Sequence, residues 1–252
     1  MANGIEIFRE YFSKYKEQYT LIGGMACNLL MSDAELDFRP TKDIDMVLIV
    51  EAMTNEFASS FWHFIEEGGY EMWKNRFGKP VFYRFINAKV PDYPYMIELF
   101  ARPDNKVDFD YTGHLIPLHI DDDISSLSAI LLNEDYYNFL LQGRTISEDI
   151  SVLDVLHIIP LKMKAWIDLT NQKKTGIHVN DRDIRKHKQD VFRLFKIVNP
   201  DAKIATTGQV YVDIRYFINK MREENIDLKS MDIKKDKDFI LEVYEAIYIT
   251  EH

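Results

Sequence analysis

Two short stretches near the start of the chain decide its fold: Leu21-Ile22-Gly23-Gly24-Met25-Ala26 and Thr41-Lys42-Asp43-Ile44-Asp45-Met46-Val47-Leu48. In the first, an apolar strand pattern meets two glycines and then a helical pattern. Glycine at such a turn lets the backbone come close to a bound phosphate, although a tight turn alone can also require it. In the second, the alternation of side chains is typical of a strand. We therefore predict the order strand, Gly-Gly turn, helix, strand.

The second strand, predicted over residues 43–50, begins with two acidic residues, Asp43 and Asp45. Residues two apart on a strand project from the same face, so the two carboxylates lie side by side. Mg²⁺ is usually held by one or two carboxylates, with substrate phosphates completing its shell. Two solvated aspartates at a strand edge would give the same pattern, so both interpretations remain open at this point.

A third acid, Glu98, lies inside the apolar stretch Tyr95-Met96-Ile97-Glu98-Leu99-Phe100. A carboxylate in an apolar strand is costly unless it is paired or coordinated. If this strand lies beside the one that carries the aspartates, the three acids could hold two metal ions. A salt bridge to a neighbour such as Arg102 is the alternative.

The remaining pattern changes character near residue 148. Before it, we predict helices over residues 5–16, 25–31 and 51–67 and strands over 19–22, 81–85, 93–101 and 115–120. After it, residues 151–170, 180–198, 209–224 and 236–249 all favour helix. The predicted fold class is α/β (α+β), with a mixed sheet flanked by helices in a domain of residues 1–147 and a helical C-terminal domain of residues 148–252.

Composition excludes several classes of protein. The 252 residues are 46% hydrophobic and 29% charged, which is typical of an ordinary globular chain. One cysteine, Cys27, cannot form an internal disulfide framework, and no apolar stretch approaches the length of a membrane helix. We expect a cytoplasmic protein without membrane contacts. The net charge is −10, yet residues 160–196 carry ten Lys or Arg against four Asp, a basic region in an acidic chain.

The order of the motifs from Tyr19 to Arg102 resembles the nucleotidyltransferase (DNA polymerase β-like) superfamily. That resemblance implies a nucleotidyltransferase fold for the first domain, with Asp43, Asp45 and Glu98 as catalytic and metal-binding residues. Gly23, Gly24 and Thr41 are the nucleotide-binding residues that it implies. Gly24 replaces the serine that many members carry at this position.

The second half resembles the helical part of the AbiEii-type nucleotidyltransferase toxins, through Leu161-Lys162-Met163-Lys164-Ala165-Trp166 and the segment 183–194. In that family a lysine and an aspartate accompany the Asp-x-Asp site. By position they are Lys162, which would meet triphosphate charge, and Asp190. On residue patterns alone, Lys162 could instead be a surface residue. Asp190 could likewise form an exposed helical pair with Lys186.

The resemblance implies an enzyme that moves a nucleotidyl group from an NTP to a hydroxyl with Mg²⁺ as cofactor. An RNA or tRNA acceptor, bound at the basic region, and an antitoxin partner follow from the toxin-like half. A small-molecule acceptor such as an aminoglycoside is an alternative. A non-catalytic nucleotide-binding or interaction module is another.

Overall fold

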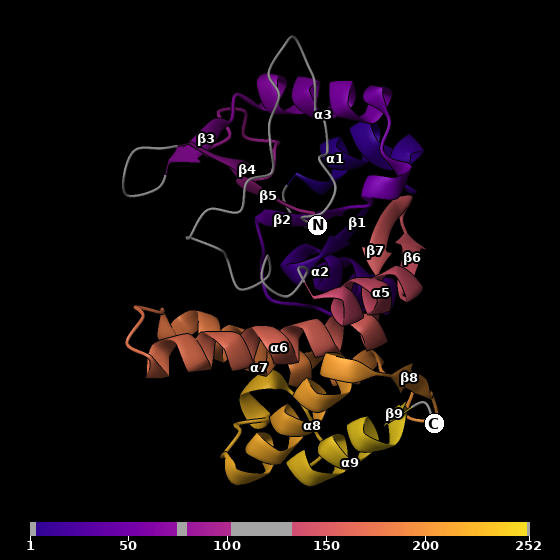
Figure 1. Ribbon diagram of the computed structural model, residues 1–252, viewed down its shortest axis with the longest axis vertical. Coiled ribbons are helices and arrows are strands. Elements are labelled where there is room, and N and C mark those ends of the chain that lie inside the picture. The colour runs from indigo at the N-terminus through magenta and orange to yellow at the C-terminus, as the bar shows by residue number, and fades with distance from the viewer. Residues whose placement is uncertain (1–3, 75–79, 102–132, 251–252) are drawn as a thin grey trace. The chain divides into compact units, whose positions relative to one another are not determined.

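The structure is a computed structural model that describes residues 4–74, 80–101 and 133–250 (Figure 1). The predicted strand over residues 115–120 and Arg102 lie outside this range. The chain divides into two compact units. The sheet unit comprises Met1–Leu132 and Arg144–Leu153, and the helical unit comprises Asn133–Gly143 and Asp154–His252. The predicted division between residues 147 and 148 falls in the turn of a hairpin that belongs to the sheet unit.

Within the described residues, the sheet unit holds a seven-stranded sheet in the order β3-β4-β5-β2-β1-β7-β6. The strands are β1 (Tyr19–Ile22), β2 (Asp43–Leu48), β3 (Glu71–Lys74), β4 (Pro80–Ile86), β5 (Met96–Phe100), β6 (Arg144–Ser147) and β7 (Ile150–Leu153). The pairs β2/β5 and β1/β7 are parallel, and the other neighbours are antiparallel. This mixed sheet confirms the predicted α/β class for the first part of the chain.

In the part of the sheet unit that the structure describes, the sheet is covered by α1 (Ile5–Phe12), α2 (Gly23–Asp33) and α3 (Asn55–Gly68). Figure 1 shows α1 and α3 on one side of the sheet and α2 on the other. Helices α1 and α3 bury an aromatic cluster against β1, made of Phe8, Phe12, Tyr19, Phe57, Phe61 and Phe64. Short 3₁₀ turns at Ser13–Tyr15 and Val50–Ala52 connect these elements. The aromatic core fixes one face of the sheet and leaves the α2 face to carry polar groups.

The helical unit contains α5 (Glu134–Gln142), α6 (Val155–Lys174), α7 (Asp181–Leu194), α8 (Gly208–Glu223) and α9 (Lys237–Ile247). In the described residues it also has a parallel pair of short strands, β8 (Ile204–Thr206) and β9 (Tyr248–Thr250), and 3₁₀ turns at Phe195–Ile197 and Lys229–Met231. This composition confirms that the second part is mostly helical. None of the described helices has the length and apolarity needed to cross a membrane.

Helix α6 contains a proline, Pro160, within its second turn. Proline has no backbone N–H, so the carbonyl of Leu156, four residues earlier, loses its usual helical donor. The hydroxyl of Tyr248 donates to this carbonyl at 2.7 Å, and Tyr248 is 2% exposed. A side chain from the far end of the unit therefore satisfies the group that Pro160 leaves without a partner.

Several predicted helix ends were wrong. Helices α1 and α7 end at Phe12 and Leu194, before the predicted residues 16 and 198, while α3 begins at Asn55 and not at residue 51 and α2 at Gly23 and not at residue 25. At two further ends the chain forms a strand. Residues 151–153 form part of β7, because all four residues of Ile150–Leu153 are buried between β1 and β6. Helix α6 begins only after Asp154, whose side chain accepts from the backbone N–H of His157 at 2.9 Å. At the other end of the unit, α9 stops at Ile247 and the chain pairs with β8 instead. In both places a strand partner overrides the helical pattern.

Candidate active site

The register of the sheet places Asp45 beside Glu98. Strands β2 and β5 run parallel with Asp43 opposite Met96 and Asp45 opposite Glu98. Paired residues on neighbouring strands project from the same face of a sheet, so Asp43, Asp45 and Glu98 share one face. The structure thus brings together the three acids that the sequence predicted on adjacent strands.

The Gly-Gly turn lies directly against this face. Gly23 has a φ of +69°, a left-handed conformation that favours glycine, and a Cβ added there would overlap the Asp45 carboxylate. A Cβ added at Gly24 would lie 2.8 Å from Thr41 Oγ1 and 3.3 Å from a guanidinium nitrogen of Arg39. Gly23 is therefore required by its conformation and by its close approach to Asp45, whereas a larger residue in place of Gly24 would have to displace the Thr41 side chain.

Glu98 makes an ion pair within the sheet. Its cross-strand neighbour on β4 is Arg84, and an Nη of Arg84 donates to Glu98 Oε1 at 2.6 Å. The Glu98 side chain is only 8% exposed, and the Arg84 guanidinium lies 5.1 Å from the centre of the Trp73 ring. A buried carboxylate needs such a partner. The partner is a residue of the neighbouring strand, which sequence spacing did not reveal.

Two of the three acids on this face are suitable ligands for Mg²⁺. Asp43 and Asp45 are partly exposed carboxylates at the beginning of β2, the hard oxygen ligands that Mg²⁺ takes together with phosphate oxygens. Glu98 is engaged by Arg84, and among the described residues no group of three or more His, Cys, Asp or Glu side chains is arranged to hold a metal ion. The two aspartates are therefore the residues that fit a metal, and Glu98 as third ligand stays a prediction.

In the helical unit, Lys162 and Asp190 meet. Lys162 Nζ on α6 lies 3.3 Å from Asp190 Oδ2 on α7, with side-chain exposures of 4% and 0%. Arg193 approaches the other oxygen of Asp190 at 3.4 Å. Lys162 is thus not a surface residue, and Asp190 is not part of a solvent-exposed helical pair. The structure thus brings the two predicted residues of the second half into contact.

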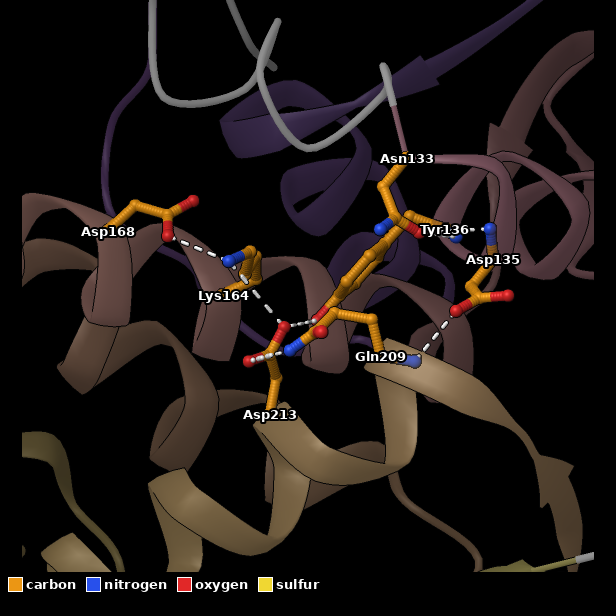
Figure 2. A network of polar contacts seen from close by, with 7 residues as sticks. All are labelled: Asn133, Asp135, Tyr136, Lys164, Asp168, Gln209 and Asp213. Carbon is orange, nitrogen blue, oxygen red and sulfur yellow. Dashed lines mark hydrogen bonds and ion pairs between the residues drawn. The ribbon is translucent and has the colours of Figure 1, made fainter.

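The neighbouring lysine, Lys164, belongs to a different cluster (Figure 2). Its Nζ donates to Asp168 Oδ1 at 2.8 Å and lies 3.6 Å from Asp213 Oδ2. Asp213 also accepts from the Tyr136 hydroxyl at 3.0 Å and from Gln209 at 2.9 Å. Burial raises the pKa of the Asp168 carboxyl, and the Lys164 contact opposes that rise. These contacts link α5, α6 and α8, so Lys164 helps to hold the three helices together.

In the folded protein, ion pairs neutralise part of the positive charge of the basic region of residues 160–196. Several of its lysines form ion pairs inside the helical unit, namely Lys164 with Asp168, Lys173 with Asp181, Lys188 with Glu224 and Lys196 with Asp232. Lys174, Arg182 and Arg185 are exposed near the connection from α6 to α7. Any attraction of this region for a polyanion rests mainly on these exposed cations.

Sequence reasoning missed Arg84 and Arg39. Arg84 lies within the predicted strand of residues 81–85, where a charged residue among apolar ones could have been matched with the charged Glu98. Arg39 comes two residues before Thr41, and only the folded loop brings it to Gly24. Comparison of the chain with known protein families, with curated proteins and with solved structures found no match.

Proposed function

We propose that this protein transfers a nucleotidyl group from an NTP to a hydroxyl acceptor in a Mg²⁺-dependent reaction. The observation that carries the proposal is the contact between Gly23 and Asp45, with Glu98 beside Asp45 in the parallel register. The Gly-Gly turn and the pair of aspartates are independent features of the sequence. Their meeting on one face of the sheet is what metal-assisted phosphoryl chemistry requires.

Each part of this face has a proposed role. The backbone amides that begin α2 at Gly23 and Gly24 would donate to triphosphate oxygens, and Thr41 and Arg39, which lie next to Gly24, would donate to the same oxygens. Asp43 and Asp45 would hold Mg²⁺, which supplies Lewis-acid stabilisation of phosphoryl charge when bound. Glu98 is proposed as third ligand or general base on the acceptor hydroxyl. Lys162 and Asp190 belong to the helical unit, and their roles toward the triphosphate stay predictions.

RNA is the proposed acceptor. The chain as a whole is acidic, so non-specific attraction to a polyanion is weak. The exposed cations Lys174, Arg182 and Arg185 are the local exception. Binding through them should weaken steeply as salt rises, because each phosphate contact releases a counterion. A small acceptor would show a much shallower salt dependence.

The test is incubation with each α-³²P-labelled NTP, Mg²⁺ and total RNA, followed by gel separation. We expect label in a discrete RNA band, and a loss of at least about 100-fold in Asp43→Asn and Asp45→Asn, because each removes a metal-binding charge. Asp37→Asn is the matched control, since Asp37 is exposed and precedes the strand. Label in no acceptor, RNA or small molecule, would refute the proposal, as would full activity in Asp45→Asn.

A further inference from the structure

The Arg84–Glu98 pair occupies the face on which the proposed metal would bind. Arg84 lies opposite Glu98 in the antiparallel register of β4 and β5, and Asp45 lies opposite Glu98 in the parallel register of β5 and β2. The three side chains therefore form one row across three neighbouring strands, in the order guanidinium, carboxylate, carboxylate. A cation at one end of this row competes for the middle carboxylate with any cation bound at the other end.

The contact between Arg84 and Glu98 is not the strongest form of such a pair. Among the described residues, a single Nη of Arg84 donates to one oxygen of Glu98, at 2.6 Å. A bidentate contact would use two parallel N–H groups. The Nε of Arg84 is buried and has no hydrogen-bond partner in the described part of the chain. One face of the guanidinium is supported by the Trp73 ring at 5.1 Å, so the side chain is held in place from β3.

We propose that Arg84 is a positioning residue that holds Glu98 in the free protein and lowers the affinity of the acidic face for a divalent cation. The inference rests on the proposed function, because it concerns the same face. It also adds a regulatory consequence. The free protein binds the bare cation weakly, and a cation that arrives with triphosphate oxygens needs fewer ligands from the protein, so it depends less on the release of Glu98 from Arg84.

Removal of Arg84 should expose this competition. In Arg84→Met, Glu98 becomes a buried carboxylate without its guanidinium, beside Asp45, and a divalent cation is then the group that relieves the charge. We expect Arg84→Met to bind Mn²⁺ alone at least about tenfold more tightly than the unchanged protein. The measurement is free Mn²⁺ by electron paramagnetic resonance during a titration without nucleotide, with circular dichroism to confirm folding.

Three variants separate this effect from a general change of charge. Arg84→Lys keeps a cation beside Glu98 and should bind Mn²⁺ as weakly as the unchanged protein. Arg144→Met removes a sheet arginine that donates to the carbonyl of Lys16, and it should have no effect. Glu98→Gln added to Arg84→Met should cancel the gain. If Arg84→Met does not fold, Trp73→Leu should give a smaller gain of the same sign by releasing the guanidinium.

The outcomes distinguish the inference from the proposed function. Equal Mn²⁺ affinity in Arg84→Met, or a gain that persists when Glu98 is also changed, overturns the role of Arg84 even if nucleotide transfer is observed. A gain that Glu98→Gln cancels supports it, and this holds even if no NTP is consumed. The transfer assay alone decides the proposed function.

Discussion

Asp43 and Asp45 in the sheet unit and Asp190 in the helical unit have opposite surroundings. In the sheet unit, Asp43 and Asp45 lie partly exposed on one face, with Gly23 packed against Asp45. In the helical unit, Asp190 is completely buried and faces Lys162, with Arg193 close by. The first arrangement keeps carboxylates accessible to a ligand. The second matches a buried carboxylate with cations of its own chain.

This difference in burial indicates whether each acid contributes mainly to activity or to stability. A partly exposed carboxylate keeps part of its hydration, so its replacement costs less stability than that of a buried one but removes any metal ligand that it supplies. A buried ion pair has lost its hydration on both sides, and removing one partner leaves an uncompensated charge. Substitution of Asp43 or Asp45 should therefore cost activity, and substitution of Asp190 should cost stability.

Asp190→Asn provides the largest test of this contrast. It leaves the buried Lys162 without its carboxylate, and we expect a loss of roughly 3–5 kcal/mol in the free energy of unfolding. Asp45→Asn should cost less than about 1 kcal/mol, because a partly exposed carboxylate is screened by solvent. Urea unfolding, followed by circular dichroism, measures both.

Two controls sharpen this comparison. Asp181→Asn changes another ion-paired aspartate of α7, one whose carboxyl pKa is lowered by Lys173 but which is exposed, and it should leave the urea midpoint unchanged. The double variant Lys162→Met with Asp190→Leu should recover much of the lost stability, because an apolar pair needs no charge partner. Equal losses in Asp190→Asn and Asp45→Asn would contradict the contrast.

Gly23→Ala should combine an intermediate loss of stability with a loss of activity. The methyl group meets the Asp45 carboxylate, and the positive φ strains any residue other than glycine by about 1–2 kcal/mol. Gly24→Ala is the matched comparison. Its φ is not left-handed, and its Cβ meets the Thr41 hydroxyl at 2.8 Å, so the stability loss should be smaller. Thermal unfolding and labelled-NTP transfer measure the two effects, and an equal response of both glycines would count against the close packing of Gly23 on Asp45.

Asp168→Asn should give the smallest effect, and one that depends on pH. Burial raises the pKa of Asp168 in the folded protein, so the folded state binds more protons than the unfolded state, and stability falls as pH rises through that interval. The asparagine variant has no such loss. It should match the wild type below about pH 4 and exceed it near pH 7 by less than about 1 kcal/mol, after allowance for solvent screening. Urea unfolding at a series of pH values measures the difference, and a difference that is constant with pH would exclude titration of Asp168 as its cause.

Local pattern was sufficient for most elements of the sheet unit. The strand Tyr19–Ile22 and the strand that begins at Asp43 follow from alternation, and the helix predicted from residue 25 begins two residues earlier, at Gly23. Local pattern was insufficient for residues 151–153. Their pattern favours a helix, but in the folded protein they form part of β7, which is buried between β1 and β6. Likewise, the spacing of Lys162 and Asp190 along the chain gave no measure of their burial. Burial is a property of the packed unit, not of the segment.

The sequence by itself determined that two carboxylates stand on one face of a strand and that two glycines stand where a strand gives way to a helix. These follow from the two-residue period of a strand and from the conformational freedom of glycine. Only the tertiary structure decided that Gly23 touches Asp45, that Glu98 stands beside Asp45 and that Arg84 holds Glu98. Strand order and register are set by long-range pairing, which no local pattern specifies. The same reason explains why the sequence motifs did not reveal Arg84, which lies on β4, a strand that these motifs do not include.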